Sequence, residues 1–517
     1  HTLGKVPIRP GRQRLQSRPL EAPTRNVLAM IEGSDPTLKA EVIAISTVAG
    51  NVPVDQATTN ALRILAAAAP VSHPPVARGA EHFPHPPTRL LVCGGGRHNA
   101  TLMAALSQRL GALPFADLME PAIELAERGH GVGVIVADKW ARQEPALKNQ
   151  PGYAQAFLPR GRAPTAGERF VFAEAGATLR KIAESKGEAF YRGEIAEQLV
   201  AHAAAHGGSL TMADLAGHVP EWVQPIEKQF AGHTVHEIPP NGQGIAALMA
   251  LGMLEKLDLV SLTVDSVASQ HMQIEAIKLA FADTYRWVAD ARHMTEVTAA
   301  DLLSDGYLSE RAKLIRPDRA SHFEHGTPPK GGTVYLTAAD ESGCMISLIQ
   351  SNYMGFGSGV VVPGTGVSLQ NRGHSFTLQD GHPNQVAPAK RPFQTIIPGF
   401  LTKDGKPQMS FGVMGGNMQP QGHVQTLVRM LVHQQQPQAA CDAPRWKWGQ
   451  GLDVDFEPTM APELREGLKA LGHRFEPAAD AYLDFGSGQF IARLSDDLQD
   501  GYAAASDSRR DGQAVGY

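Results

Sequence analysis

The residue with the clearest chemical potential is a threonine that follows two glycines. Thr333 comes directly after Gly331 and Gly332 and opens an alternating segment that runs into an Asp/Gly turn. A threonine hydroxyl is a weak nucleophile unless a base lies beside it, and the α-amino group of an N-terminal threonine is such a base. Its reference pKa of about 7.7–8.0 suits proton transfer near neutral pH. A cut between Gly332 and Thr333 would therefore create a self-contained nucleophile, whereas an uncut Thr333 is an ordinary threonine at the start of a strand.

A glycine pair further along the chain is suited to stabilising a negatively charged oxygen. Gly415 and Gly416 lie before an expected amphipathic helix over residues 421–432. Backbone N–H groups near a helix N-terminus, with no side chain in the way, can donate hydrogen bonds to a developing oxyanion. The alternative is a plain turn between a strand and a helix.

The motifs around these residues resemble the γ-glutamyltransferase family of N-terminal-nucleophile hydrolases. They follow the family's order, and their residues are similar to those of the branch that holds oxamate amidohydrolase and acylase-like proteins. The resemblance extends over about residues 107–517. The segments that carry it are 113–122, 239–244, 333–336, 340–343, 351–359, 363–366, 369–373, 390–393, 414–416 and 442–446.

The resemblance assigns roles to four residues. It implies that Thr333 is both the self-cleavage residue and the catalytic nucleophile, which forms an acyl-enzyme that water releases. Ser351, eighteen residues after Thr333, matches the family's second hydroxyl residue, which hydrogen-bonds the nucleophile. Gly415 and Gly416 match the glycine pair of the family's oxyanion hole. For Ser351 the alternative is a strand serine with a local backbone bond.

The expected substrate pocket departs from that of the glutathione-cleaving members. Tyr353 stands where those proteins have an asparagine, and a tyrosine cannot copy the donor-and-acceptor pattern of an amide. His374 and Ser375 occupy the register of the aspartate pair that holds the glutamate amino group, and Gln394 and Thr395 replace two serines. These replacements argue against a γ-glutamyl substrate.

An arginine in the same region offers a different kind of recognition. Arg372, which follows Asn371, presents a planar fork that fits a small carboxylate. The alternative is an arginine that is solvated or paired structurally. We expect Asn371 and Arg372 to bind substrate together with Tyr353, Gln394 and Thr395.

These features predict a self-processing threonine amidohydrolase that hydrolyses a small amide, oxamate-like or acylase-like, through Thr333. We expect cleavage into a large subunit of residues 1–332 and a small subunit of residues 333–517, and the oligomeric state stays open. The chemistry requires no metal or organic cofactor, and the sequence contains no His-Glu-x-x-His pattern. Two alternatives stay open: a γ-glutamyltransferase or glutathione hydrolase, and a fusion protein that neither matures nor turns over substrate.

The elements that must position these residues form an α/β protein. Residues 107–332 are expected to be mostly helical, and residues 333–517 to be rich in strands. Hairpins are predicted where segments 334–339 and 345–351 flank an Asp/Gly turn, and where 394–402 and 408–414 flank another. A late strand pair is expected at 489–494 and 501–505. The resemblance makes the layout more definite, namely an αββα sandwich of two stacked antiparallel sheets between helical layers.

The first 106 residues form an atypical segment where the family normally has its own strands and a carboxylate-binding arginine. Residues 38–68 resemble a nucleoside hydrolase fragment, with a strand over 41–48, but lack that family's aspartate cluster. Residues 89–106 resemble a fragment of anhydromuramic-acid kinases. A flexible arm over 1–36, a helix over 56–68 and a Pro/His-rich linker over 70–87 complete this mosaic, and the non-maturing alternative rests on it.

Composition limits the partners and the compartment. The net charge of −5 over 517 residues gives no reason to expect nucleic acid or an anionic membrane surface as a partner. Cys93, Cys344 and Cys441 are far apart in sequence, which fits a reducing compartment. No apolar run reaches the roughly 20 residues of a membrane span. The first residues contain no apolar segment typical of a signal peptide, although an upstream leader could be missing, so we expect a cytoplasmic protein.

Overall fold

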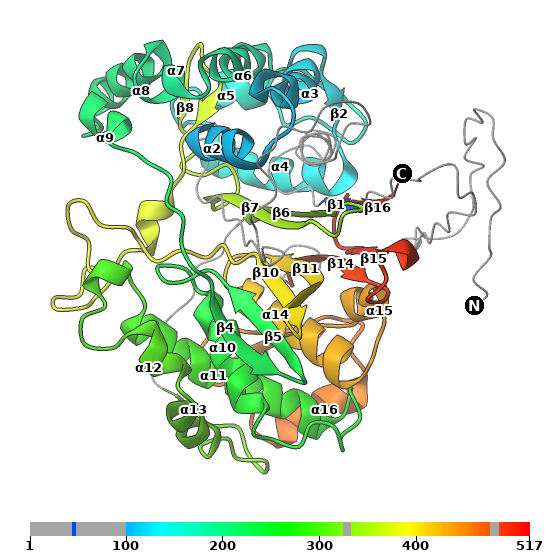
Figure 1. Cartoon of the computed structure of the whole chain (residues 1–517). Coiled ribbons are helices and arrows are strands. Elements are labelled where there is room, and N and C mark those ends of the chain that lie inside the picture. Colours follow the sequence, from blue (N-terminus) through cyan, green and yellow to red (C-terminus); the bar gives the residue numbers. More distant parts are fainter. Residues whose placement is uncertain (1–43, 48–99, 324–331, 476–484, 517) are drawn as a thin grey trace.

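Two antiparallel sheets form the centre of the protein. The computed structural model describes residues 44–47, 100–323, 332–475 and 485–516 (Figure 1). One sheet has four strands in the order β16-β1-β6-β7, and the other has six in the order β15-β14-β11-β10-β5-β4. The strands of the first sheet are β1 Ala44–Thr47, β6 Gly332–Ala339, β7 Met345–Tyr353 and β16 Gln513–Val515; those of the second are β4 Ile226–Phe230, β5 His233–Glu237, β10 Gly399–Lys403, β11 Lys406–Met414, β14 Ser487–Arg493 and β15 Tyr502–Ser506.

Helices cover the outer face of each sheet, and the two inner faces pack on each other (Figure 1). On the side of the four-stranded sheet lie α2 Ala100–Leu110, α3 Phe115–Arg128, α4 Val134–Leu147, α5 Tyr153–Phe157, α6 Ala173–Ser185, α7 Glu188–Tyr191, α8 Glu194–Ala205 and α9 Met212–Ala216. On the side of the six-stranded sheet lie α10 Gly244–Leu254, α11 Val267–Trp287, α12 Ala299–Leu303, α13 Asp305–Ala312, α14 Met418–Leu427, which continues as η3 Val428–Val432, α15 Pro437–Asp442 and α16 Pro462–Ala470. The αββα sandwich that the sequence predicted is therefore confirmed.

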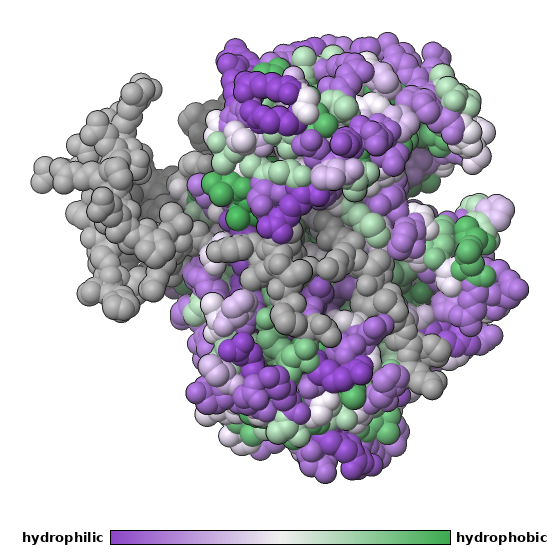
Figure 2. Space-filling model, turned by 180° about the vertical axis from the view of Figure 1, so that it is seen from behind, coloured by the Kyte–Doolittle hydropathy of each residue, from purple (hydrophilic) through white to green (hydrophobic). Residues whose placement is uncertain are grey.

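Shorter elements connect these layers. They are β2 His130–Gly131, β3 Arg169–Phe170, β8 Val361–Val362, β9 Val367–Ser368, β12 Trp446–Trp448 and β13 Val454–Phe456, with the 3₁₀ turns η1 Ala291–His293, η2 Arg372–Ser375 and η4 Leu498–Asp500. Hydrophilic side chains cover much of the face seen in Figure 2. Among the described helices, none combines the length and apolar character of a membrane span.

The largest part of the core lies between the six-stranded sheet and its helices. Every residue of α10 is buried, because this helix is apolar around its whole circumference and packs against β4, α11, α13 and α14. An apolar stripe on α11 also faces this core, where Ile277 and Phe281 are fully buried. Burial of this size fixes the six-stranded sheet as a rigid support for the loops at its edge.

The predicted hairpins are confirmed, with one shifted boundary. The second hairpin begins at β10, at Gly399, rather than at Gln394. Gln394 instead pairs with a neighbouring loop, since its N–H donates to the Asn241 carbonyl and its carbonyl accepts from the Gln243 N–H, each at 2.9 Å. Pro398 has no N–H to donate to a ladder, which favours a strand that starts after it. The predicted helix over 421–432 begins earlier, at Met418.

The atypical front segment contributes one strand to the fold. The predicted strand over 41–48 is present as β1, which pairs with β16 on one side and β6 on the other. It therefore lies inside the four-stranded sheet, where it joins β16 to the β6–β7 hairpin. The predicted arm, helix and linker over 1–36, 56–68 and 70–87 lie outside the described residues.

Candidate active site

Thr333 lies inside the protein at the beginning of β6. Its exposed fraction is only 1%. Gly332 pairs with Tyr353 of the adjacent strand β7, and the register shifts between Gly332 and Val334, so Thr333 lies at an irregularity of the ladder. A bulge of this kind re-aims a side chain away from the regular pleat.

The hydroxyl of Thr333 has two hydrogen-bond partners. It donates to Ser351 Oγ at 3.3 Å, and it accepts from Gln419 Nε2 at 3.4 Å. Ser351 Oγ also accepts from the backbone N–H of Tyr353 at 2.8 Å. Thr333 and Ser351, which the resemblance pairs, are thus in contact in the structure, and the position of the Thr333 oxygen is defined from two sides.

The glycine pair forms a turn that only glycine adopts readily. Gly415 and Gly416 have φ values of 136° and 61°, in the region that a Cβ disfavours. Their carbonyls accept hydrogen bonds from the first N–H groups of α14, at Met418 and Gln419. The side-chain amide of Gln243 donates to the Gly416 carbonyl at 2.8 Å, which fixes the turn from the other side.

A buried pair of ionisable residues supports the strand that leads into this turn. His423 Nε2 accepts from the Val413 N–H at 3.1 Å, so the other ring nitrogen, Nδ1, carries the proton and donates to Glu237 at 2.7 Å. Both side chains are fully buried. Burial raises the pKa of Glu237, and the contact with His423 opposes this shift. The pair thereby ties α14 to β11 next to the glycines.

Arg372 is a buried cation close to the same centre. It lies in η2 and is 3% exposed. Its Nη1 donates to Thr395 Oγ1 at 2.7 Å, and its guanidinium lies 4.5 Å from the centre of the Tyr353 ring. Among the described residues, Nε and Nη2 find no hydrogen-bond partner. Burial without a carboxylate lowers the pKa of Arg372 to about 9.

The ring that covers Arg372 belongs to a strained residue. Tyr353 is fully buried and has a φ of 79°, which is uncommon for a bulky side chain. Such a backbone persists only where its surroundings impose it, and it is found often at functional sites. Here the same residue fixes Ser351 through its N–H and Arg372 through its ring.

The predicted pocket residues divide into two groups. The described contacts connect Thr333, Ser351, Tyr353, Arg372, Thr395, Gly416, Gln243 and Gln419 into one unit, which we call the Thr333 cluster. Asn371 and Gln394 instead use their side-chain oxygens on backbone, at Met354 N–H and Thr395 N–H respectively.

Two glutamines of the cluster were missed by the sequence predictions. Gln243 joins the Thr395 and Gly416 carbonyls, and Gln419 contacts the Thr333 hydroxyl. A signal was present for Gln419, since α14 carries polar residues at 419, 421, 423 and 425 although the whole helix is buried. Buried polar side chains need partners, so their run marks a helix with specific contacts.

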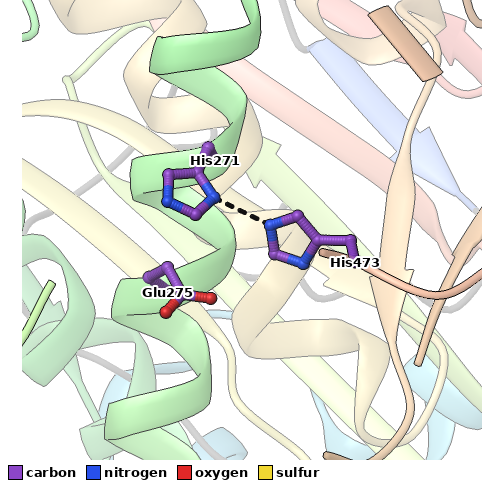
Figure 3. A group of neighbouring side chains, drawn as sticks. All are labelled: His271, Glu275 and His473. Atoms are coloured by element: carbon purple, nitrogen blue, oxygen red, sulfur yellow. Dashed lines mark hydrogen bonds between the residues drawn. The ribbon is translucent and has the colours of Figure 1, made fainter. Parts of the chain in front are cut away.

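A second buried polar cluster lies where α11 meets the segment after α16 (Figure 3). His271 and Glu275 are one turn apart on α11, and His473 follows α16. The ligand atoms of these three residues lie within 4.8 Å of one another, a grouping that could hold a metal ion. With Lys278 they form what we call the His473 cluster.

The contacts of the His473 cluster favour a structural role. His271 Nε2 donates to the Arg316 carbonyl at 2.7 Å, so its Nδ1 accepts from His473 Nε2 at 2.8 Å. Glu275 is bonded at one oxygen to Lys278 Nζ, at 2.6 Å, and at the other to the Ser321 N–H, at 2.9 Å. A metal would have to displace the Lys278 ammonium, and the existing bonds instead anchor residues 316–321.

Comparisons with known proteins identify the family and the fold. The gamma-glutamyltranspeptidase family model matches residues 99–517. The oxamate amidohydrolase proenzyme of Klebsiella pneumoniae is 35% identical over 85% of this chain and 83% of its own length. The glutathione hydrolase-like YwrD proenzyme of Bacillus subtilis is 33% identical over 80% of this chain and 78% of its own. The crystal structure of a cephalosporin acylase from Bacillus halodurans, 37% identical, covers 97% of this chain and 99% of its own with a TM-score of 0.80.

Proposed function

The chain belongs to the gamma-glutamyltranspeptidase family of N-terminal-nucleophile hydrolases, and we propose that it is a self-processing amidohydrolase in which Thr333 is the nucleophile. The observation that carries this proposal is the buried Thr333 hydroxyl, held between Ser351 and Gln419 beside the unpaired Arg372 guanidinium. Two similar proteins are named as proenzymes, which supports maturation by cleavage.

Maturation would use the strand start described above. In the precursor, the Thr333 hydroxyl attacks the Gly332 carbonyl, and the resulting ester is hydrolysed to free the Thr333 amino group. The large part would then comprise residues 1–332, with 107–332 mostly helical, and the small part residues 333–517. Because β6 of the small part pairs with β1 of the large part, the two parts stay in one sheet after the cut.

Turnover would follow the chemistry of an N-terminal threonine. The Thr333 oxygen forms a bond to the carbonyl carbon of the substrate amide, and its proton moves to the free α-amino group. The tetrahedral oxyanion accepts backbone hydrogen bonds at Gly415 and Gly416. The C–N bond then breaks, the amine leaves with the proton, and water cleaves the acyl-enzyme ester to regenerate Thr333.

The substrate that fits best is a small amide that bears a carboxylate close to the scissile carbonyl. Within the described part of the chain, two nitrogens of the buried Arg372 have no hydrogen-bond partner, and a carboxylate is the group that a guanidinium binds with two parallel hydrogen bonds. Oxamate, which joins a carboxylate directly to an amide, meets this requirement. Tyr353 and Thr395 would close the remaining sides of the anion site. Neither step requires a metal or an organic cofactor.

The first test is the state of the purified chain. Wild-type protein should give two fragments on a denaturing gel, with intact masses that place the cut before Thr333, and Thr333→Ala should give one chain. An uncleaved but folded wild-type protein would instead favour the non-maturing fusion.

The second test is the choice between substrates. Ammonia release from oxamate should exceed p-nitroaniline release from γ-glutamyl-p-nitroanilide for the cleaved protein. Robust release from the γ-glutamyl compound, with none from small carboxylate amides, would overturn the assignment of the pocket and favour a glutathione hydrolase.

A further inference from the structure

A glutamine that no sequence motif singled out lies on the proposed nucleophile. Gln419, in the first turn of α14, is fully buried. Its Oε1 accepts from the Ile397 N–H at 3.1 Å, which identifies the other end of the amide as the NH₂ group. That NH₂ group faces Thr333 Oγ1 at 3.4 Å. The orientation of the amide is thus set by the backbone, and only a donor can face the threonine oxygen.

The position of this donor matters most when the threonine oxygen carries charge. In the acyl-enzyme, Thr333 Oγ is the ester oxygen. When water attacks the ester carbonyl, its proton passes to the α-amino group of Thr333. When the C–Oγ bond then breaks, the bonding electron pair stays on Oγ, which takes that proton from the α-ammonium group. A hydrogen-bond donor already aimed at Oγ stabilises this developing alkoxide without reorganisation.

We propose that Gln419 is a further catalytic residue, whose side-chain N–H stabilises the Thr333 oxygen as it leaves during hydrolysis of the acyl-enzyme. This inference rests on the proposed function of Thr333. Its role differs from that of Ser351, which accepts the hydrogen bond that the Thr333 hydroxyl donates. It also differs from the proposed role of the glycine turn, which is to donate to the carbonyl oxygen of the substrate.

The same helix offers a matched control. Gln421 is also buried, and its amide also bonds to backbone, donating to the Asn417 and Trp448 carbonyls and accepting from the Trp448 N–H. None of these bonds involves Thr333. Replacing either glutamine by alanine leaves buried backbone groups unpaired, so Gln419→Ala and Gln421→Ala should lower the unfolding temperature by comparable amounts.

The kinetic outcomes should differ. Gln419→Ala is expected to lower kcat roughly 100-fold, as the loss of one charge-stabilising donor does. Because hydrolysis of the ester is slowed more than its formation, KM should fall with kcat, and the small fragment should gain the mass of the acyl group during turnover. Gln421→Ala should keep kcat and KM within about threefold of wild type.

A second variant separates the hydrogen bond that the Gln419 amide donates from the shape of its side chain. Gln419→Glu keeps the side chain and the acceptor for Ile397, but its ionised carboxylate cannot donate to Thr333. Its kcat, relative to wild type, should rise as the pH falls and the carboxyl gains a proton. A merely structural role would leave this ratio unchanged with pH.

Two results would overturn the inference for a wild-type protein that cleaves itself and turns over substrate. One is a Gln419→Ala variant with the kcat of wild type, and the other is a Gln421→Ala variant that loses as much kcat as Gln419→Ala. A wild-type protein with neither cleavage nor turnover would instead contradict the proposed function itself, so the two failures are distinguishable.

Discussion

The protein buries a cation in each of two polar clusters, and the two cations have different surroundings. Lys278 of the His473 cluster is 1% exposed and lies 2.6 Å from the carboxylate of Glu275. Arg372 of the Thr333 cluster is 3% exposed and contacts a hydroxyl and an aromatic ring, without a salt bridge among the described residues. Burying a charge is costly unless it is paired.

The difference indicates which cluster is built for the fold and which for a ligand. In the His473 cluster the partner of the cation is part of the chain, and the bonds connect α11 with residues 316–321. In the Thr333 cluster, two nitrogens of the cation have no hydrogen-bond partner among the residues that the structure describes. A site that leaves a charge unpaired loses stability, and a bound carboxylate would restore it.

The largest expected effect is on the paired cation. Lys278→Met should lower the free energy of unfolding by about 3–5 kcal/mol, because Glu275 would remain buried without its counterion. Chemical denaturation would measure this loss, while kcat per folded molecule should stay within about twofold. The double variant Lys278→Met/Glu275→Gln, which keeps an acceptor for the Ser321 N–H, should recover most of the stability. A double variant as unstable as the single one would contradict the ion-pair explanation.

The unpaired cation should show the opposite pattern. Arg372→Met should lower kcat/KM for a carboxylate-bearing amide roughly 100-fold, the cost of a lost charge-assisted contact of about 3 kcal/mol. Its unfolding temperature should be equal to that of wild type or higher, since an unpaired charge leaves the interior.

A ligand test sharpens this contrast. A saturating small dicarboxylate should raise the unfolding temperature of wild type but not of Arg372→Met. A strongly destabilised Arg372→Met protein would show that the guanidinium is structural, and the comparison would fail.

A smaller effect should appear in acid and should arise from the His473 cluster. Burial, with the nearby Lys278 and His271, lowers the pKa of His473 to about 3. Between about pH 6.5 and pH 3 the unfolded imidazole therefore binds a proton that the folded one does not, and stability falls as the pH falls. This one group contributes a slope of at most about 1.4 kcal/mol per pH unit.

The check is a series of urea midpoints from pH 7 to pH 4.5. His473→Asn should be less stable at pH 7 but should lose less stability on acidification than wild type does. Parallel curves for the two proteins would exclude His473 as the source of the acid sensitivity.

Much of the fold was predictable because its signals are local. The hairpin at Asp404-Gly405 forms where two residues adopt positive φ, at 51° and 76°, which the Asp-Gly pair favours. The pairing of Thr333 with Ser351 came from the family resemblance, and the two residues lie on adjacent strands of one hairpin.

The rest depends on contacts between distant parts of the chain. His271 and His473 meet across 202 residues, and nothing near either one indicates the other. The partner of Gln419, 86 residues away, is defined only by the place of α14 relative to the start of β6. Likewise, an arginine in a polar turn gives no sign in sequence that it is buried like Arg372, since burial is set by the elements that close over it.

The burial of Thr333 has a consequence for how the gene can be organised. A small part translated on its own would begin with a methionine before Thr333, at the place where Gly332 pairs with Tyr353. Because Thr333 is only 1% exposed, an enzyme that trims chain ends would have no access to that extra residue once the sheet has formed. Under the cleavage that we propose, a single reading frame avoids this problem, because the folded chain itself would free the Thr333 amine.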